Sequence, residues 1–330
     1  MVILRRLAKG ANLKQNTKVA IVGTGLIGQA WALVFARAGC EVRLWDGDKV
    51  ALKQALLLVE KLAEELQHSG LVDDAVVLMS HIRCYDDLDK ALDSVDYVQE
   101  SLPEVLVIKQ AFYVQLDALA PASAVIGSST SSIPASAFTE HLKTRTRCLV
   151  AHPVNPPYLI PVVEICGAPW TSPEAVQACI DLMNAVQQKP VHVRRELDGF
   201  ILNRLQGALL REAFRLVEQG YVDVDGLDVT IRDGLGLRWS FMGPFETIDL
   251  NAPGGLADYC ERYGGMYQAI ATEQVSTAAW SPELADQLHK ARREHLPAEA
   301  LAERRNWRDR RLMALIAHKK QLESDPSTRS

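Results

Sequence analysis

A histidine and a glutamate near the middle of the chain have side chains that could exchange a proton. His152 opens a proline-rich segment, and Glu164 interrupts the otherwise apolar run at residues 162–165. A buried carboxylate needs a partner, and an imidazole bonded to it would have a raised pKa and a fixed tautomer. The pair therefore predicts a general base, His152, that is oriented by Glu164. The alternative interpretation is that Glu164 faces solvent from an edge strand and that His152 fills a turn.

Three glycines near the start of the chain predict a binding site for the phosphates of a nucleotide. Gly23, Gly25 and Gly28 form the pattern GxGxxG between an apolar run and a helical pattern. In a dinucleotide-binding fold the first glycine allows a tight turn, the second lets the backbone approach a pyrophosphate, and the third permits close packing of helix on strand. The N–H groups at the helix N-terminus, where Leu26 and Ile27 lie, would bind the phosphates. A plain strand–turn–helix with incidental glycines is the alternative.

An acidic residue stands where such a fold holds the adenine ribose. Asp46 ends the apolar run at residues 42–45 and follows Gly23 by 23 residues. This is close to the spacing of about 20 residues that is typical of the fold. The carboxylate would accept hydrogen bonds from the ribose and repel a 2′-phosphate. The predicted cofactor is therefore NAD rather than NADP.

The elements that must position these groups alternate between strand and helix. The predicted strands are at residues 19–22, 42–45, 97–99, 124–126, 148–150 and 162–165, and the predicted helices between them include 29–38 and 49–68. This alternation predicts an α/β fold with a Rossmann-type, doubly wound and mostly parallel sheet that helices cover on both faces. Ligands bind beyond the carboxyl ends of the strands in such a sheet. We expect Glu100-Ser101, the serine-rich segment at 128–132 and His152 to meet at that edge.

The pattern changes near residue 195, after which the chain has helical periodicity and few strand-like runs. We expect a flexible basic arm at residues 1–17, an NAD-binding domain at 18–195, a smaller all-helical substrate domain at 196–322 and a disordered tail at 323–330. The arm contains no acidic residue and no serine. A transit peptide is the alternative interpretation of the arm, although such peptides are usually rich in serine.

Composition argues against several classes of function. The net charge is −5, so the chain has no overall positive field that would attract nucleic acid. No apolar run reaches the roughly 20 residues that a membrane-spanning helix needs. The six cysteines are scattered without a CxxC pair, and no histidines stand at metal-ligand spacing. We expect a cytoplasmic protein with no metal, no nucleic-acid partner and no membrane partner.

Four segments together resemble the 3-hydroxyacyl-CoA dehydrogenase superfamily. They are the glycine turn at 23–28, the serine-rich segment, His152-Pro-Val-Asn-Pro-Pro with Glu164, and residues 198–206, which read Asp-Gly-Phe-Ile-Leu-Asn-Arg-Leu-Gln. Residues 151–158, 234–238, 243–247, 250–252 and 304–309 are most similar to one branch, that of L-gulonate 3-dehydrogenase, also known as lambda-crystallin. The resemblance extends over residues 18–320, which is nearly the whole chain.

The resemblance implies a role for each matched residue. His152 matches the catalytic base and Glu164 its partner, Ser131 and Asn203 match residues that hold the substrate oxygen, and Asp46, Glu100 and Lys109 match positions that hold the cofactor. The match at Lys109 depends on the register of the segment that separates it from Glu100. The superfamily is usually dimeric through its helical domain, so we expect a homodimer.

The branch also implies the substrate. We expect an oxidoreductase that transfers hydride to NAD from the secondary alcohol of a small 3-hydroxy acid such as L-gulonate. A carboxylate substrate favours an arginine in the pocket. Arg238 is the candidate, in the stretch at residues 235–239, which we expect to be a glycine-bounded turn just before Gly243-Pro244. It is otherwise a surface or interface arginine.

Three alternatives remain open. A 3-hydroxyacyl-CoA substrate would need basic residues for CoA, and Lys53 and Lys61 on the long helix could serve unless they only form a solvated face. Carnitine would need an aromatic enclosure, which Trp239 and Phe241 near Arg238 suggest. The alternative of another class is a crystallin-like protein that binds NAD without turnover.

Overall fold

The computed structural model describes residues 13, 16–275 and 277–324. The predicted basic arm lies outside the described residues except at residues 13, 16 and 17. The predicted tail lies outside them from residue 325 onward. Helix α14 (Leu301–Ser324) contains the first two residues of that tail, so these two are helical.

The chain forms two compact units. The first contains the described residues up to Asn203 and those from Asn306 onward, and the second is Arg204–Arg305. The division therefore falls inside helix α8 (Phe200–Glu218), later than the boundary expected near residue 195. Most of α14 belongs to the first unit, because Met313 is buried in that unit's core.

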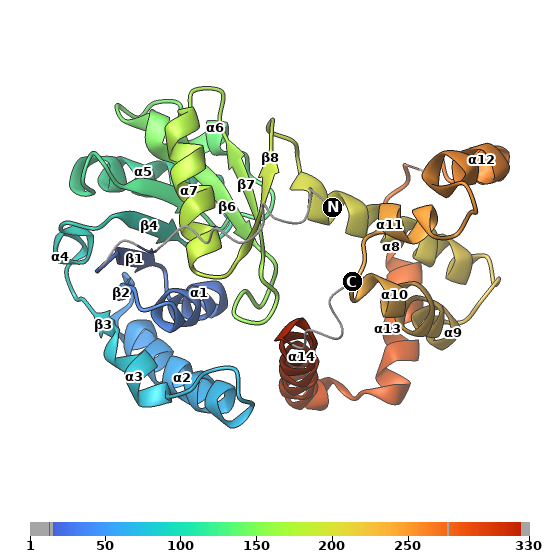
Figure 1. The fold of residues 1–330 in the computed structure, drawn as a ribbon, viewed down its shortest axis with the longest axis horizontal. Coiled ribbons are helices and arrows are strands. Elements are labelled where there is room, and N and C mark those ends of the chain that lie inside the picture. The colour runs from blue at the N-terminus through green and yellow to red at the C-terminus, as the bar shows by residue number, and fades with distance from the viewer. Residues whose placement is uncertain (1–12, 14–15, 276, 325–330) are drawn as a thin grey trace. The chain divides into compact units, whose positions relative to one another are not determined.

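An eight-stranded sheet with the order β3-β2-β1-β4-β5-β6-β7-β8 forms the centre of the first unit (Figure 1). The strands are β1 (Lys18–Val22), β2 (Glu41–Trp45), β3 (Ile82–Cys84), β4 (Tyr97–Glu100), β5 (Val125–Ser128), β6 (Cys148–Pro153), β7 (Val162–Gly167) and β8 (Lys189–Val193). All neighbours are parallel except β6 and β7, which are antiparallel. The predicted doubly wound, mostly parallel sheet is confirmed, and the chain reverses its direction of winding between β1 and β4.

Alternate residues of the strands face two separate cores. Val19 and Ile21 belong to one core, whereas Ala20 and Val22 belong to the other. The first core also contains side chains of α1 (Leu26–Arg37), α2 (Lys49–His68), α3 (Ala75–Ser80), α7 (Pro173–Ala185) and α14, and the second contains side chains of α4 (Leu88–Leu92), α5 (Leu106–Leu119) and α6 (Ala135–Thr139). Helices cover both faces of the sheet, which explains why its central strands are mostly apolar.

Two strands of the sheet were not predicted. Strand β3 has only three residues, too few to show a period of two. Strand β8 begins Lys189-Pro190 and is largely exposed. Proline cannot donate a hydrogen bond to a neighbouring strand, and the sheet tolerates it here because β8 is an edge strand.

The second unit is helical. Besides most of α8 it contains α9 (Val224–Val229), a π-helical turn (Thr230–Leu235), α10 (Gly236–Trp239), α11 (Pro244–Asp249), α12 (Gly255–Glu273), α13 (Pro282–His295) and a 3-10 turn (Ala298–Ala300); a further 3-10 turn (Arg145–Arg147) lies in the first unit. None of the described residues of the second unit is in a strand. Across the described part of the chain, no helix is both long and apolar enough to span a bilayer.

Candidate active site

The turn between β1 and α1 has free space at one glycine and none at the other two. A Cβ on Gly28 would lie 1.9 Å from the carbonyl oxygen of Gly23. Gly23 itself has a φ of +92°, and a Cβ there would lie 2.6 Å from the carbonyl oxygen of Ser101. Gly25, in contrast, has no atom within 4 Å of such a Cβ. The turn is therefore tight against the sheet and open at Gly25, as a bound pyrophosphate requires.

Helix α1 begins at this turn without a side-chain cap. Gly25 is its N-cap residue, and no acidic residue lies in the first turn. The N–H groups at Leu26 and Ile27 have no side-chain acceptor in the described part of the chain. Unpaired N–H groups at a helix N-terminus bind anions. The residues present therefore fit the phosphates of a dinucleotide.

Asp46 follows β2 and faces the glycine turn. Its Oδ2 atom accepts hydrogen bonds from the N–H of Thr24 at 2.7 Å and from the Thr24 hydroxyl at 2.9 Å. Its Oδ1 atom accepts one bond, from the N–H of Asp48 at 2.9 Å. Because a carboxylate oxygen can accept two hydrogen bonds, Oδ1 retains an acceptor position. The carboxylate is thus held in place and can still bind a ribose hydroxyl.

Glu100 and Lys109 form a fully buried ion pair. The Lys109 Nζ atom lies 2.8 and 2.9 Å from the two carboxylate oxygens of Glu100. The Ser128 hydroxyl and the N–H of Leu102 also donate to Glu100. Both residues have a relative exposure of 0%. These contacts do not support the expected direct binding of a cofactor by Glu100 or Lys109; they support a role in joining β4, β5 and α5 in the interior of the first unit.

Glu104, four residues after Glu100, contacts the serine-rich segment instead. Its Oε1 atom accepts bonds from the Thr130 hydroxyl at 2.6 Å, from the N–H groups of Ser131 and Ser132 at 3.0 Å each, and from the Ser132 hydroxyl at 3.0 Å. Burial would raise the pKa of Glu104, but the bond from Thr130, the charge of Lys109 and the bonds from Ser132 outweigh it and lower the pKa. Glu104 therefore holds this loop as a carboxylate. Glu104 was not among the predicted site residues, although Pro103 before it marks the chain's exit from the strand.

His152 and Glu164 lie opposite each other on neighbouring strands. They are paired in the antiparallel register of β6 and β7. The His152 Nδ1 atom lies 2.8 Å from the Glu164 Oε2 atom, and both side chains are buried. His152 Nε2 has no hydrogen-bond partner among the described residues. A carboxylate bound at Nδ1 leaves Nε2 as the acceptor of a proton.

The N-terminus of α8 completes the surroundings of this pair. The N–H groups of Ile201 and Leu202 donate to Glu164 Oε1 at 2.7 and 3.0 Å. Phe200, fully buried with a φ of +47°, lies with its ring 5.7 Å from the imidazole of His152. A bulky residue with positive φ is strained, and such strain persists where the surroundings hold the chain in place. The helix start is thus held with its N–H groups on the carboxylate.

These N–H groups also affect the charge of Glu164. Burial would raise its pKa, but the hydrogen bonds from His152, Leu202 and Ile201 outweigh burial and lower the pKa. Glu164 is therefore ionised near neutral pH.

Asn203 reaches the serine-rich segment from the first turn of α8. Its Nδ2 atom donates to the main-chain carbonyl of Ser131 at 2.9 Å. The Ser131 hydroxyl lies 3.5 Å from Glu104 Oε1, at the limit of a hydrogen bond. Glu104 and Asn203 thus hold the backbone of Ser131 while its hydroxyl is only weakly engaged. The structure therefore brings Ser131 and Asn203 together.

Arg238, the predicted substrate arginine, lies in the second unit. It is part of helix α10, which follows the π-helical turn directly, so the predicted glycine-bounded turn is wrong. Gly236 is helical here, with φ −63° and ψ −30°. Arg238 is exposed, as are Trp239 and Phe241.

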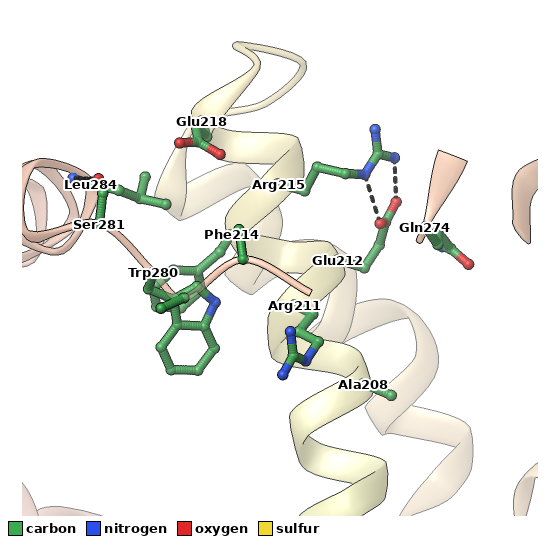
Figure 2. Close-up of a pocket in the computed structure, with 12 residues that line it drawn as sticks. Ala208, Arg211, Glu212, Phe214, Arg215, Glu218, Gln274, Trp280, Ser281 and Leu284 are labelled. Atoms are coloured by element: carbon green, nitrogen blue, oxygen red, sulfur yellow. Dashed lines mark hydrogen bonds and ion pairs between the residues drawn. The ribbon is translucent and has the colours of Figure 1, made fainter. Parts of the chain in front are cut away.

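A separate cavity lies beside α8 in the second unit. Its volume is about 470 Å³. Among the side chains that line it, the stacked rings of Phe214 and Trp280 lie on one side of the helix and the ion pair of Glu212 with Arg215 lies on the other (Figure 2). None of the predicted site residues lines it. Within the described residues no group of three or more His, Cys, Asp or Glu side chains could hold a metal ion, and all six cysteines are free.

Comparison with known proteins finds relatives of both units. The family model of the 3-hydroxyacyl-CoA dehydrogenase NAD-binding domain matches residues 18–197, and that of the C-terminal domain matches residues 199–296. A lambda-crystallin homolog from Bos taurus is 42% identical over 309 residues, which are 92% of this chain and 96% of that protein. An L-carnitine dehydrogenase from Pseudomonas putida is 37% identical over 270 residues, which are 82% of each chain.

Among solved structures, the fold is similar to that of 5-formyl-3-hydroxy-2-methylpyridine 4-carboxylic acid 5-dehydrogenase, described as an NAD+-dependent dismutase. The TM-score is 0.79 at 26% identity, and the match covers 94% of this chain and 99% of that one. The similarity therefore extends over both units.

Proposed function

The chain belongs to the 3-hydroxyacyl-CoA dehydrogenase family of NAD-dependent oxidoreductases that act on CH–OH groups, and we propose that its substrate is a small 3-hydroxy acid similar to L-gulonate. The observation that carries the proposal is the arrangement of His152. Its Nδ1 atom is held by Glu164 at 2.8 Å, and its Nε2 atom has no partner among the described residues. Nε2 is therefore the proton acceptor that oxidation of an alcohol needs.

The residues divide the work as follows. His152 Nε2 takes the proton of the substrate hydroxyl, and the Glu164 carboxylate stabilises the imidazolium that forms. The carbon that bears this hydroxyl loses a hydride, for which bound NAD would be the acceptor, and the alcohol becomes a ketone. The Ser131 hydroxyl and the Asn203 amide hold the substrate oxygen. A positioned base contributes about 10²- to 10⁴-fold to the rate.

The cofactor lies across the glycine turn in this proposal. Gly23, Gly25 and Gly28 shape the turn, and the N–H groups at Leu26 and Ile27 bind the phosphates. Asp46 binds the adenine ribose.

Replacement of His152 tests the catalytic assignment. His152→Ala should abolish turnover and leave NAD affinity unchanged, as measured by NADH formation and by calorimetric titration with NAD. His192→Ala, on the edge strand β8, is the matched control. Turnover retained in His152→Ala would rule out His152 as the base.

The substrate assignment depends on Arg238. We assign the substrate carboxylate to this exposed guanidinium. Two relatives act on carboxylic acids by name: L-carnitine is itself a 3-hydroxy acid, and the structural relative acts on a pyridine carboxylic acid. Arg238→Met should raise KM for the acid far more than the Kd for NAD. The control is Arg232→Met, which removes an exposed arginine of the preceding turn that pairs with Asp233. An unchanged KM would contradict the assignment.

A panel of substrates separates the related activities. L-gulonate, L-carnitine and 3-hydroxybutyryl-CoA are compared by NADH formation. Turnover of the CoA ester alone would implicate Lys53 and Lys61, which are both exposed on α2. Preference for carnitine would implicate Trp239 and Phe241. Binding of NAD without turnover of any of them would favour the crystallin-like alternative.

We also propose that the helical unit supplies the surface of a homodimer. It exposes large apolar side chains, among them Phe241, Phe245, Leu250 and Met266. We propose that these side chains together form the interface, because large exposed apolar surfaces mark protein interfaces. Light scattering coupled to size-exclusion chromatography should give twice the chain mass. Phe245→Asp should shift the particle toward the monomer, whereas a wild-type monomer would contradict the proposal.

A further inference from the structure

A chain of buried and half-buried hydrogen bonds ends at Ser101, beside the glycine turn. The Tyr97 hydroxyl lies 2.7 Å from Gln99 Oε1, and Gln99 Nε2 lies 2.7 Å from Ser129 Oγ and 3.3 Å from the Ala151 carbonyl. Trp31 Nε1 lies 3.1 Å from the same Ser129 Oγ. Ser129 Oγ in turn lies 2.9 Å from Ser101 Oγ. The direction of each bond follows from which atoms can donate.

The main-chain carbonyl of Ala151 determines the orientation of Gln99. A carbonyl can only accept, so the amide nitrogen of Gln99 must be the atom that faces it. The amide oxygen then faces Tyr97, whose hydroxyl donates. The second hydrogen of the Gln99 nitrogen is left to point at Ser129.

Ser129 therefore receives two hydrogen bonds. Both Gln99 and the indole of Trp31 donate to its oxygen, and an indole N–H can only donate. These two bonds occupy both lone pairs of the Ser129 hydroxyl. Its own hydrogen must then point to Ser101, whose oxygen accepts it. The hydrogen of the Ser101 hydroxyl has no acceptor among the described residues.

Ser101 lies at the point where the sheet changes its direction of winding. It follows β4, and its N–H donates to the carbonyl of Val22, the last residue of β1, at 2.8 Å. Its carbonyl oxygen is the atom that excludes a side chain at Gly23. Ser101 is half-buried, so its hydroxyl is within reach of a ligand at the turn.

The strand order indicates which part of a dinucleotide would lie there. Asp46 follows β2, the glycine turn follows β1, Ser101 follows β4 and His152 is in β6, and these strands are adjacent in the order β2-β1-β4-β5-β6. In the proposed placement the adenine ribose is at Asp46, the pyrophosphate is at the glycines and the reacting carbon is at His152. The part of NAD between the pyrophosphate and the reacting carbon is the nicotinamide ribose, and Ser101 lies between the glycine turn and His152 in the strand order. We propose that Ser101 donates a hydrogen bond to an oxygen of the nicotinamide ribose of bound NAD.

The inference rests on the proposed placement of the reacting end at His152, but its test does not use turnover. ADP, ADP-ribose and NAD are titrated calorimetrically into the wild-type chain and Ser101→Ala. ADP lacks the second ribose and should bind both equally. ADP-ribose and NAD should each bind Ser101→Ala about 3- to 10-fold more weakly, as expected for the loss of one hydrogen bond. Ser101→Thr, which keeps a hydroxyl, should restore most of the affinity.

Two results would overturn the inference. Equal loss of affinity for ADP would place the contact at the pyrophosphate, and unchanged affinity for ADP-ribose would remove the contact altogether. Ser80→Ala, an exposed serine on α3, is the matched control, and the thermal midpoint of each variant shows whether it has folded. Failure of the wild-type chain to bind ADP would overturn the nucleotide site itself. A wild-type chain that binds ADP-ribose but oxidises no hydroxy acid would count only against the proposed function.

Discussion

His152 and Glu164 are cross-strand partners in the one antiparallel pair of the described sheet, and their side chains meet at 2.8 Å. Directly opposed residues on adjacent strands point to the same face of a sheet. A parallel pairing of β6 with β7 would need a long crossover connection, which the short segment between these residues does not provide. The antiparallel pairing of β6 with β7 therefore places the Glu164 carboxylate beside the His152 imidazole.

Glu164→Gln should lower kcat by at least about 10-fold without changing the Kd for NAD. The amide keeps one acceptor oxygen, which can serve either His152 Nδ1 or the N–H groups of α8, and it carries no charge to stabilise the imidazolium. Steady-state kinetics and NAD titration measure the two effects separately. Glu174→Gln, an exposed glutamate at the start of α7, is the control. An unchanged kcat would show that the Glu164 charge has no part in turnover.

Glu104→Ala should raise KM for the substrate and lower kcat, because the loop that carries Ser131 loses its common acceptor. Glu104→Gln retains an acceptor oxygen and should keep most of the activity. Each hydrogen bond to a charged group contributes about 1.5–3 kcal/mol, so a lower thermal midpoint is expected for the alanine variant as well. Steady-state kinetics of the two variants and the wild type measure KM and kcat. Equal activity in Glu104→Ala and wild type would show that Glu104 does not position the loop that carries Ser131.

Gly25→Ala and Gly28→Ala should fail in different ways. At Gly28 an added Cβ meets a backbone oxygen at 1.9 Å, so the thermal midpoint should drop by several degrees, about the shift that 1–3 kcal/mol produces. At Gly25 nothing is near, so the fold should keep its midpoint, but the methyl group would occupy the place of the pyrophosphate and weaken NAD binding. Differential scanning fluorimetry with and without NAD distinguishes them. A Gly25→Ala chain that binds NAD normally would remove the nucleotide from this turn.

Asp46→Asn should shift the preference between NAD and NADP toward NADP. The amide oxygen can still accept hydrogen bonds, but the negative charge that repels a 2′-phosphate is absent. We expect the ratio of the two Kd values to change by about 10-fold or more, the effect of roughly 1.4 kcal/mol. Titration of both dinucleotides into each protein measures the ratio. A constant ratio would show that charge at Asp46 does not decide the choice of cofactor.

Acid should remove the stability that Glu164 contributes. The pKa of this carboxyl is lowered in the folded chain because the bonds from His152 and the α8 backbone outweigh burial. A lowered pKa stabilises the fold above the ordinary value of about 4.3, and the contribution is lost as the pH falls through the lowered value. The difference in thermal midpoint between wild type and Glu164→Gln should therefore be full at neutral pH and shrink in acid. A difference that grows as the pH falls would have the wrong sign.

The local signals in the sequence were sufficient for the elements that carry the site. The apolar runs before Gly23 and before Asp46 predicted two strands, and the pattern after Gly28 predicted a helix between them. The structure confirms all three elements, as β1, α1 and β2. Helix α2 runs over the predicted residues, Lys49–His68. These features depend on neighbours in the chain, and an apolar strand buried on both faces has a recognisable composition.

Such local signals could not show which of two acidic residues, Glu100 or Glu104, contacts the serine-rich segment. Glu100 and Glu104 are four residues apart, and resemblance selected Glu100. Glu100 ends a strand that is buried on both faces, so its side chain lies in the core and requires Lys109 as a partner. Glu104 lies past Pro103, outside the sheet, where its carboxylate can reach the serine-rich loop.

The sequence by itself determined the fold class, the glycine-rich turn between β1 and α1 and the residues able to do acid–base chemistry, because these follow from local pattern and composition. Only the tertiary structure decided which polar residues are in contact: Glu164 with His152, Glu104 with Ser131, and Ser101 with Ser129. For His152 and Glu164 the physical reason is strand register. A shift of one residue would turn either side chain to the opposite face of the sheet, and packing between segments far apart in the chain sets that register.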